Sequence, residues 1–135
     1  MINTMGVQPF DFENPSPFLL LEAIEDILNY LNHEIILIDE FAFLNRENIS
    51  LELDFDGSMR DKQYYTNGLL ISGLFEHLDN EKFPDIENKF QLLLKTLSNL
   101  LQKKLQNANL SDTHCVFVEA DEDYGDVVIG FWRCI

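Results

Sequence analysis

The sequence predicts a single α+β domain, in which an antiparallel sheet built from two hairpins packs against two or three helices. A chain of 135 residues is the size of one domain, and residues 1–135 contain no internal repeat. Two segments, 17–32 and 84–107, place their apolar residues at helical spacing. Two pairs of segments rich in β-branched and aromatic residues flank polar turns, which is typical of hairpins. Because 46% of the residues are hydrophobic and 11 are Phe, the chain can build a core.

The first helix follows a segment without hydrophobic period, and we expect residues 1–14 to form an extended arm or an early edge strand. Ser16 and Pro17 predict the start of the helix, because serine caps helix N-termini and proline is favoured at the first helical position. The helix should end near His33. Its apolar positions recur three or four residues apart, at Leu20, Leu21, Ile24, Ile27, Leu28 and Leu31.

A first hairpin is expected from residues 35–43 and 49–56, which flank the polar stretch 45–48. The second segment alternates strictly between apolar and polar residues, and this period of two predicts a strand with one buried face. Most of its solvent-side positions would be carboxylates. Those positions are Ser50, Glu52, Asp54 and Asp56.

Two further helices are predicted between the hairpins. A short helix is expected over 64–78, where leucines recur at helical spacing, although Gly68 and Gly73 each cost roughly 1 kcal/mol relative to Ala. The strongest helical pattern covers 84–107, with Pro84 at its start and a wide apolar stripe along its length. We expect this long helix to anchor the core.

Residues 115–120 and 127–134 predict a second hairpin around an acidic turn. If Tyr124 and Gly125 form a two-residue turn, the numbers of paired residues sum to 249. The expected pairs are Val118 with Phe131, Phe117 with Trp132, and Cys115 with Cys134. This register would gather five carboxylates around one exposed tip, namely Glu119, Asp121, Glu122, Asp123 and Asp126.

Metal and cofactor sites find no support in the sequence. Two cysteines are too few for a disulfide framework, and we expect Cys115 and Cys134 to be reduced and buried. A calcium loop that starts at Asp54 fails, because its sixth and twelfth positions hold Arg60 and Tyr65 instead of Gly and Glu. The histidines and cysteines lack the spacing of zinc ligands. We therefore expect no metal and no cofactor.

Enzymatic activity is not expected either. Ser72 lacks the Gly-x-Ser-x-Gly context of a nucleophile elbow. His114 and Cys115 are adjacent in a predicted strand, so their side chains point to opposite faces and cannot form a local base–nucleophile pair. The carboxylates lie on solvent-side positions, where nothing raises their pKa for acid catalysis.

Charge is the strongest functional signal. The chain has 24 Asp and Glu against 9 Lys and Arg, a formal net charge of −15. Residues 1–61 hold 13 acids and 2 bases, whereas residues 82–110 hold 5 bases and 2 acids. Such a chain repels nucleic acid and anionic lipid and attracts basic proteins. With no signal peptide and no apolar run near the ~20 residues that span a bilayer, we expect a cytoplasmic protein with a basic protein partner.

The leading interpretation is a small acidic inhibitor, in its sharpest form a bacterial immunity protein that covers the cationic surface of a toxin such as a nuclease. Tyrosines beside the acids support a recognition surface. The expected partner-binding residues are Glu52, Asp54, Asp56, Glu119, Asp121, Glu122, Asp123, Tyr124 and Asp126. Two alternatives stay open. One is an acidic dimeric chaperone that holds a secreted effector in an apolar groove, and the other is a phage-type inhibitor that mimics nucleic acid.

Overall fold

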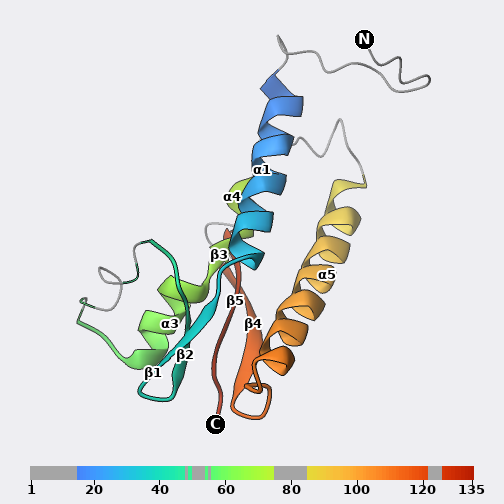
Figure 1. Ribbon diagram of the computed structural model, residues 1–135. Helices are drawn as coiled ribbons and strands as arrows, with labels where there is room; N and C mark the ends of the chain where they lie inside the picture. The colour runs from blue at the N-terminus through green and yellow to red at the C-terminus, as the bar shows by residue number, and fades with distance from the viewer. Residues whose placement is uncertain (1–14, 48, 50–53, 55, 75–84, 122–125) are drawn as a thin grey trace, which may run out of the picture.

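The computed structural model describes residues 15–47, 49, 54, 56–74, 85–121 and 126–135 (Figure 1). The fold is a mixture of helices with two small antiparallel sheets, as the α+β prediction requires. The elements are α1 (Pro15–Leu31), β1 (Ile35–Ile38), β2 (Phe41–Leu44), α3 (Met59–Asn67), β3 (Leu69–Leu70), α4 (Ile71–Leu74), α5 (Ile86–Asn107), β4 (His114–Asp121) and β5 (Asp126–Arg133). The hairpin β1–β2 forms one sheet, and the other has the strand order β3–β5–β4.

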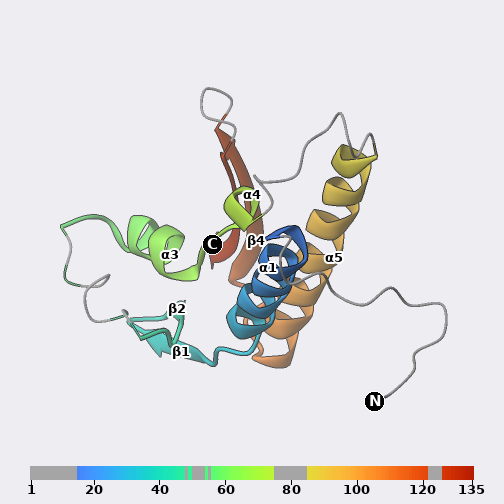
Figure 2. The ribbon, with the colours of Figure 1, turned by 90° about the horizontal axis from the view of Figure 1, so that it is seen from above.

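Both predicted long helices are confirmed, at Pro15–Leu31 and Ile86–Asn107, within two residues of the expected starts. Figures 1 and 2 show them side by side, running in the same direction along one side of the three-stranded sheet. Their buried side chains meet those of β2 and β5 in one hydrophobic core. The fully or nearly buried members include Ile27, Tyr30, Leu44, Leu97, Leu101, Leu105, Ile129 and Phe131.

The prediction for the first hairpin is wrong in its second strand. Residues 35–38 pair with residues 41–44, and the chain reverses at Asp39 and Glu40. Both turn residues have positive φ, 51° and 71°, as a two-residue turn of type I′ requires. Because Asp-Glu is not a usual sequence for that turn, the segment 35–43 resembled one continuous strand. Of the expected strand 49–56, Ile49 and Asp54 are helical, and residues 50–53 and 55 lie outside the described part.

The predicted helix 64–78 is replaced by three short elements up to Leu74, and residues 75–78 lie outside the described residues. Helix α3 begins earlier than expected, where Ser58 accepts a hydrogen bond from the Asp61 N–H at 3.1 Å. It ends at Gly68. A Cβ atom there would lie 2.5 Å from the Tyr64 carbonyl oxygen and 2.9 Å from Val128, so only glycine lets the chain pass this close to β5.

The second hairpin has the predicted strands but a different register. Val118 pairs with Ile129, and Phe117 pairs with Gly130, so each partner lies two residues earlier than expected. Strand β4 ends at Asp121 and β5 begins at Asp126, so four residues connect them instead of the two that set the prediction. A shift of two residues keeps every side chain on its expected face of the sheet.

The segment 63–72 runs antiparallel along the free edge of β5 and satisfies that edge in two different ways. Leu69 and Leu70 of β3 pair with Ile129 and Val128 through the backbone. On either side of this short strand, side chains form the hydrogen bonds to the backbone of β5. The contacts are Ser72 Oγ with the Val127 N–H at 2.9 Å, Asn67 Nδ2 with the Phe131 carbonyl at 3.1 Å, and Gln63 Oε1 with the Arg133 N–H at 3.0 Å.

The same buried amides also bind the inner edge of β2. Asn67 accepts from the Leu44 N–H at 2.8 Å and donates to the Ala42 carbonyl at 2.9 Å, and Gln63 donates to that carbonyl at 3.0 Å. Asn67 and Gln63 therefore lie between β2 and β5 and satisfy backbone groups that a further strand would otherwise pair. We call these two residues, with His114, the polar clamp.

His114 completes the polar clamp from β4. Its Nε2 accepts a hydrogen bond from the Ala42 N–H at 3.0 Å, so the proton of the neutral ring is on Nδ1, which contacts Thr113 Oγ1 at 2.9 Å. Burial lowers the pKa of His114, and the positive charge of Arg133 acts in the same direction. A neutral ring is what the clamp needs, because a protonated Nε2 would face the Ala42 donor.

Candidate functional site

The outward face of the C-terminal hairpin is the surface turned away from the core. Phe131 and Ile129 are fully buried, and the alternation of the strands therefore places their neighbours Trp132, Gly130 and Val128 on the opposite side of β5. The strand register places Cys115, Phe117 and Glu119 of β4 on the same side. The outward face, as defined here, consists of Cys115, Phe117, Glu119, Asp126, Val128, Gly130 and Trp132.

An aromatic cluster covers one half of the outward face. The rings of Phe117 and Trp132 stack with centroids 4.2 Å apart, and Tyr64 of α3 stacks on Phe117 at 5.4 Å. Tyr65 contacts Tyr64 edge to face at 5.2 Å and is itself exposed. Gly130 makes the packing possible, because a Cβ there would lie 2.7 Å from the Phe117 ring. The cluster is thus a rigid aromatic platform.

The arginines of the chain are engaged with rings and carbonyl groups. Arg60 lies 4.0 Å over the Trp132 ring, a cation–π contact at the border of the aromatic cluster. Arg46 donates to the carbonyls of Thr66 and Gly68 at 3.1 Å. Arg133 lies 3.7 Å from the Glu40 carboxylate. These contacts fix the arginines near α3 and β2 and leave the far half of the outward face acidic.

That far half carries two of the predicted site residues. Glu119 and Asp126 are exposed, and the register places both on the outward face, two residues along the strands from Phe117 and Val128. Asp121 pairs with Asp126 in the ladder. Glu122, Asp123 and Tyr124 lie outside the described residues. The outward face therefore carries Glu119 next to Phe117, and Asp126 four residues along β5 from Gly130.

The other predicted acids are in a different place. Asp54 and Asp56 are exposed, but Asp54 is helical and both precede α3 instead of lying on a strand. Figures 1 and 2 show the start of α3 well apart from the end of the hairpin where β4 stops. Glu52 lies outside the described residues. The structure thus does not join Asp54 and Asp56 with Glu119 and Asp126 in one surface.

The two cysteines are free thiols, although the prediction that both are buried is wrong. Cys115 is half-buried on the outward face and Cys134 is exposed. Burial and a hydrogen bond with Cys134 raise the pKa of Cys115 to about 11. Cys115 is therefore protonated at neutral pH and is a poor nucleophile.

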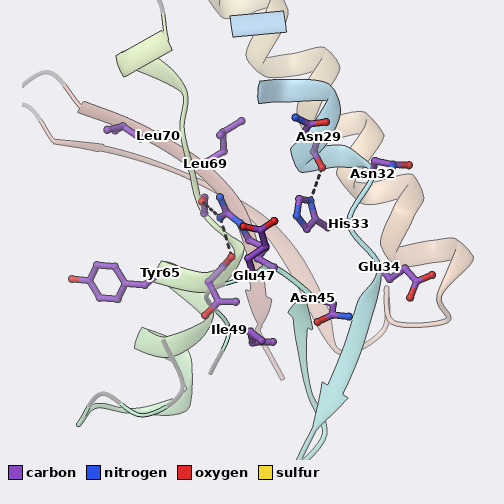
Figure 3. A pocket seen from close by; sticks show the side chains of 13 residues that line it. Asn29, Asn32, His33, Glu34, Asn45, Glu47, Ile49, Tyr65, Leu69 and Leu70 are labelled. Atoms are coloured by element: carbon purple, nitrogen blue, oxygen red, sulfur yellow. Dashed lines mark hydrogen bonds between the residues drawn. The ribbon is translucent and has the colours of Figure 1, made fainter. Parts of the chain in front are cut away.

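A polar cavity of about 930 Å³ lies where the ends of α1, β2 and α3 meet (Figure 3). Its walls carry the amides of Asn29, Asn32 and Asn45 together with His33 and Arg46. In Figure 3 the His33 ring points to the Asn29 carbonyl. Arg46 donates to the carbonyls of Thr66 and Gly68, so the strongest donors are already engaged. Sequence patterns do not indicate this cavity, because its lining residues come from α1, α3, β3 and the segments that connect elements.

The sequence did contain part of the signal for the aromatic cluster. Phe117 and Trp132 were expected to contact each other, and they do so as diagonal neighbours across the strands. The roles of Arg60 and Gly130 were missed, since both depend on how α3 packs against the sheet.

Among the described residues, no group of three or more His, Cys, Asp or Glu side chains is arranged to hold a metal ion. In the same part of the chain, no helix is long and apolar enough to cross a membrane. Comparisons with protein families, curated proteins and solved structures found no match to this chain. Function must therefore be argued from the chemistry of the site.

Proposed function

We propose that this protein is an acidic inhibitor that binds a basic protein partner through the outward face of its C-terminal hairpin. In its sharpest form it is an immunity protein that neutralises a toxin with a cationic surface, such as a nuclease. The observation that carries the proposal is the placement of Glu119 and Asp126 on the outward face, with Glu119 next to the aromatic cluster and Asp126 nearer the end of the hairpin.

Electrostatics supplies the first argument. A nuclease must bind phosphate, so its active site and surroundings are cationic, and an acidic surface can cover them. The net charge of −15 also steers a basic partner toward the protein and speeds association. Because Glu119 and Asp126 extend from paired strands, their carboxylates are held on a rigid support.

The aromatic rings supply the second argument. Tyrosine and tryptophan are enriched among the residues that dominate binding energy, and such residues sit in the centre of an interface with charged groups at the rim. Tyr65 and Trp132 would provide that centre, with Glu119 and Asp126 on one side. An aromatic centre with a carboxylate rim matches the chemistry of a basic protein surface.

Co-expression with the product of the adjacent open reading frame tests the proposal in cells. We expect that product to arrest growth of a bacterial host when expressed alone and this chain to restore growth. The double variant Glu119→Gln/Asp126→Asn should protect less well. Glu34→Gln/Asp112→Asn removes the same charge from exposed positions off the outward face and should protect fully. An adjacent product without toxicity, or toxicity that this chain does not relieve, contradicts the proposal.

A second function, an acidic chaperone for a secreted effector, is favoured by one specific observation. Phe18, Ile24 and Leu28 of α1 are more than half exposed, although such side chains are usually buried. A chaperone would use them to hold an apolar segment of its client. In that case the adjacent product is not toxic, and its complex with this chain survives high salt, since apolar contacts are not screened.

A further inference from the structure

An apolar stripe lies along the solvent side of α1. Phe18, Leu21, Ile24 and Leu28 follow one another at intervals of three or four residues, and their side chains are 56%, 45%, 52% and 59% exposed. The spacing places all four on one side of the helix. The buried side is separate and carries Ala23, Ile27 and Tyr30. Helix α1 is thus apolar on two sides, of which the core uses one.

Helix α5 carries a second, sparse stripe made of two exposed leucines with the exposed Thr96 between them. Leu92 and Leu100 are 65% and 44% exposed. Lys104 donates from Nζ to the Leu31 carbonyl at 3.0 Å, which shows that this flank of α5 faces the end of α1. Leu100 lies one turn before Lys104, and Leu28 lies one turn before Leu31. Because the two helices run in the same direction (Figure 1), Leu28 and Leu100 are separated along the helices by about as much as Leu31 and Lys104.

The two stripes together form what we call the α1–α5 face, which consists of Phe18, Leu21, Ile24, Leu28, Leu92 and Leu100. Its two halves have opposite charge. Helix α1 contains three exposed acids, Glu22, Glu25 and Asp26, and no Lys or Arg. Helix α5 contains four lysines against one acid, Glu87. A face that combines exposed apolar side chains with acids on one helix and lysines on the other is complementary to itself.

We propose that a second copy of this chain covers the α1–α5 face in a two-fold dimer. The axis runs parallel to the helices, so that α1 of each protomer packs on α5 of the other and carboxylates meet lysines. An axis across the helices would instead place α1 against α1 and set like charges together. The proposal is independent of the proposed inhibitor function, because the outward face of the hairpin is not part of this dimer. It competes with the chaperone function, which would place a client on the same side chains of α1.

Sedimentation equilibrium of the full chain at about 50 μM and physiological salt tests the dimer. We expect twice the mass of 15.7 kDa. Leu28→Lys would place a cation against the partner's lysines, and Leu100→Glu would place a carboxylate against the partner's acids. Each should raise the dissociation constant about tenfold or more, because like charges oppose each other across the interface. Leu37→Lys is the matched control, since Leu37 is also 59% exposed but lies on β1.

The double variant Leu28→Lys/Leu100→Glu tests whether α1 of one protomer packs on α5 of the other. In the proposed dimer, position 28 of one protomer meets position 100 of the other, so the new charges attract and most of the dimer returns. Circular dichroism should show native folding for every variant, because all substituted side chains are exposed. If the wild-type chain is a monomer, the dimer proposal is wrong, and the α1–α5 face must be covered by residues 1–14 or by another protein. A dimer that Leu37→Lys weakens as much as Leu28→Lys also overturns it, and so does a double variant that stays dissociated.

Discussion

The two hairpins of this protein reach stability by different routes. The β4–β5 hairpin has eight residues in each strand, and stacked aromatic rings cover one half of its outward face. The β1–β2 hairpin has four residues in each strand, and the polar clamp of Gln63, Asn67 and His114 binds its inner edge. The first route is local, because it depends on neighbours across two adjacent strands. The second is tertiary, because it depends on side chains from α3 and β4.

This difference shows that buried strand edges can be satisfied without another strand. Ala42 uses both of its backbone groups on side chains of the polar clamp, and Leu44 uses its N–H on Asn67. A primary carboxamide has the same donor and acceptor as a peptide group, so Asn and Gln can replace a paired backbone. The clamp also connects the two sheets, since Asn67 and Gln63 bond β5 as well.

Asn67→Ala, which removes part of the clamp on the β1–β2 hairpin, should lower the free energy of unfolding the most. It leaves the buried Leu44 N–H and Phe131 carbonyl without the partner that Asn67 provides, and each such group costs ~1–3 kcal/mol. We expect the free energy of unfolding to fall by about 3 kcal/mol in urea denaturation. The exposed Asn99→Ala on α5 is the control and should change it by no more than about 0.5 kcal/mol. A loss below about 1 kcal/mol for Asn67→Ala would show that the clamp is dispensable.

Gly130→Ala tests how closely the aromatic rings pack on the β4–β5 hairpin. The new Cβ would lie 2.7 Å from both the Phe117 ring and the Asn67 carbonyl, so the aromatic stack must shift. Overpacking of this kind costs about 2 kcal/mol, and the near-ultraviolet signal of Trp132 should change with it. Gly73→Ala is the matched control, because its nearest neighbour is a flexible Leu70 methyl group at 3.4 Å. Equal unfolding midpoints for the two variants would contradict the close packing.

The pH dependence of stability tests the role of His114 in the polar clamp. Because folding lowers the pKa of His114, the unfolded chain binds more protons below about pH 6.5, and stability must fall as the pH decreases through that range. Between pH 7 and pH 5.5 we expect the wild type to lose about 1 kcal/mol more than His114→Gln, which cannot titrate. The measurement is urea denaturation at both pH values. Identical losses in the two proteins would mean that His114 is not held neutral.

The elements that sequence patterns predicted are those with long local periods. The helices α1 and α5 and the strands of the second hairpin extend over eight residues or more, so their periodicity outweighs local irregularities. The turn at Asp39 and Glu40 was missed because its positive φ angles have no glycine or asparagine to mark them. The helical state of Ile49 and Asp54 was missed because alternating sequence favours a strand.

For the candidate site, alternation placed Glu119 and Asp126 correctly on one face, since the strands formed where expected. The register failed by two residues because turn length cannot be read from the acidic segment 121–126 alone. The polar clamp could not be predicted, as Gln63, Asn67 and His114 are isolated polar residues until α3 packs between β2 and β5. Tertiary contacts of this kind carry no sequence period.

The proposed function requires that the acidic half of the outward face bind a basic protein, and stopped-flow association with the adjacent gene product measures that binding. We expect the association rate to fall steeply as salt rises from 50 to 500 mM (about one order of magnitude in ionic strength). At low salt, Glu119→Gln/Asp126→Asn should associate about fivefold more slowly than Glu34→Gln/Asp112→Asn. Rates that do not depend on salt, or equal rates for the two variants, would contradict the claim.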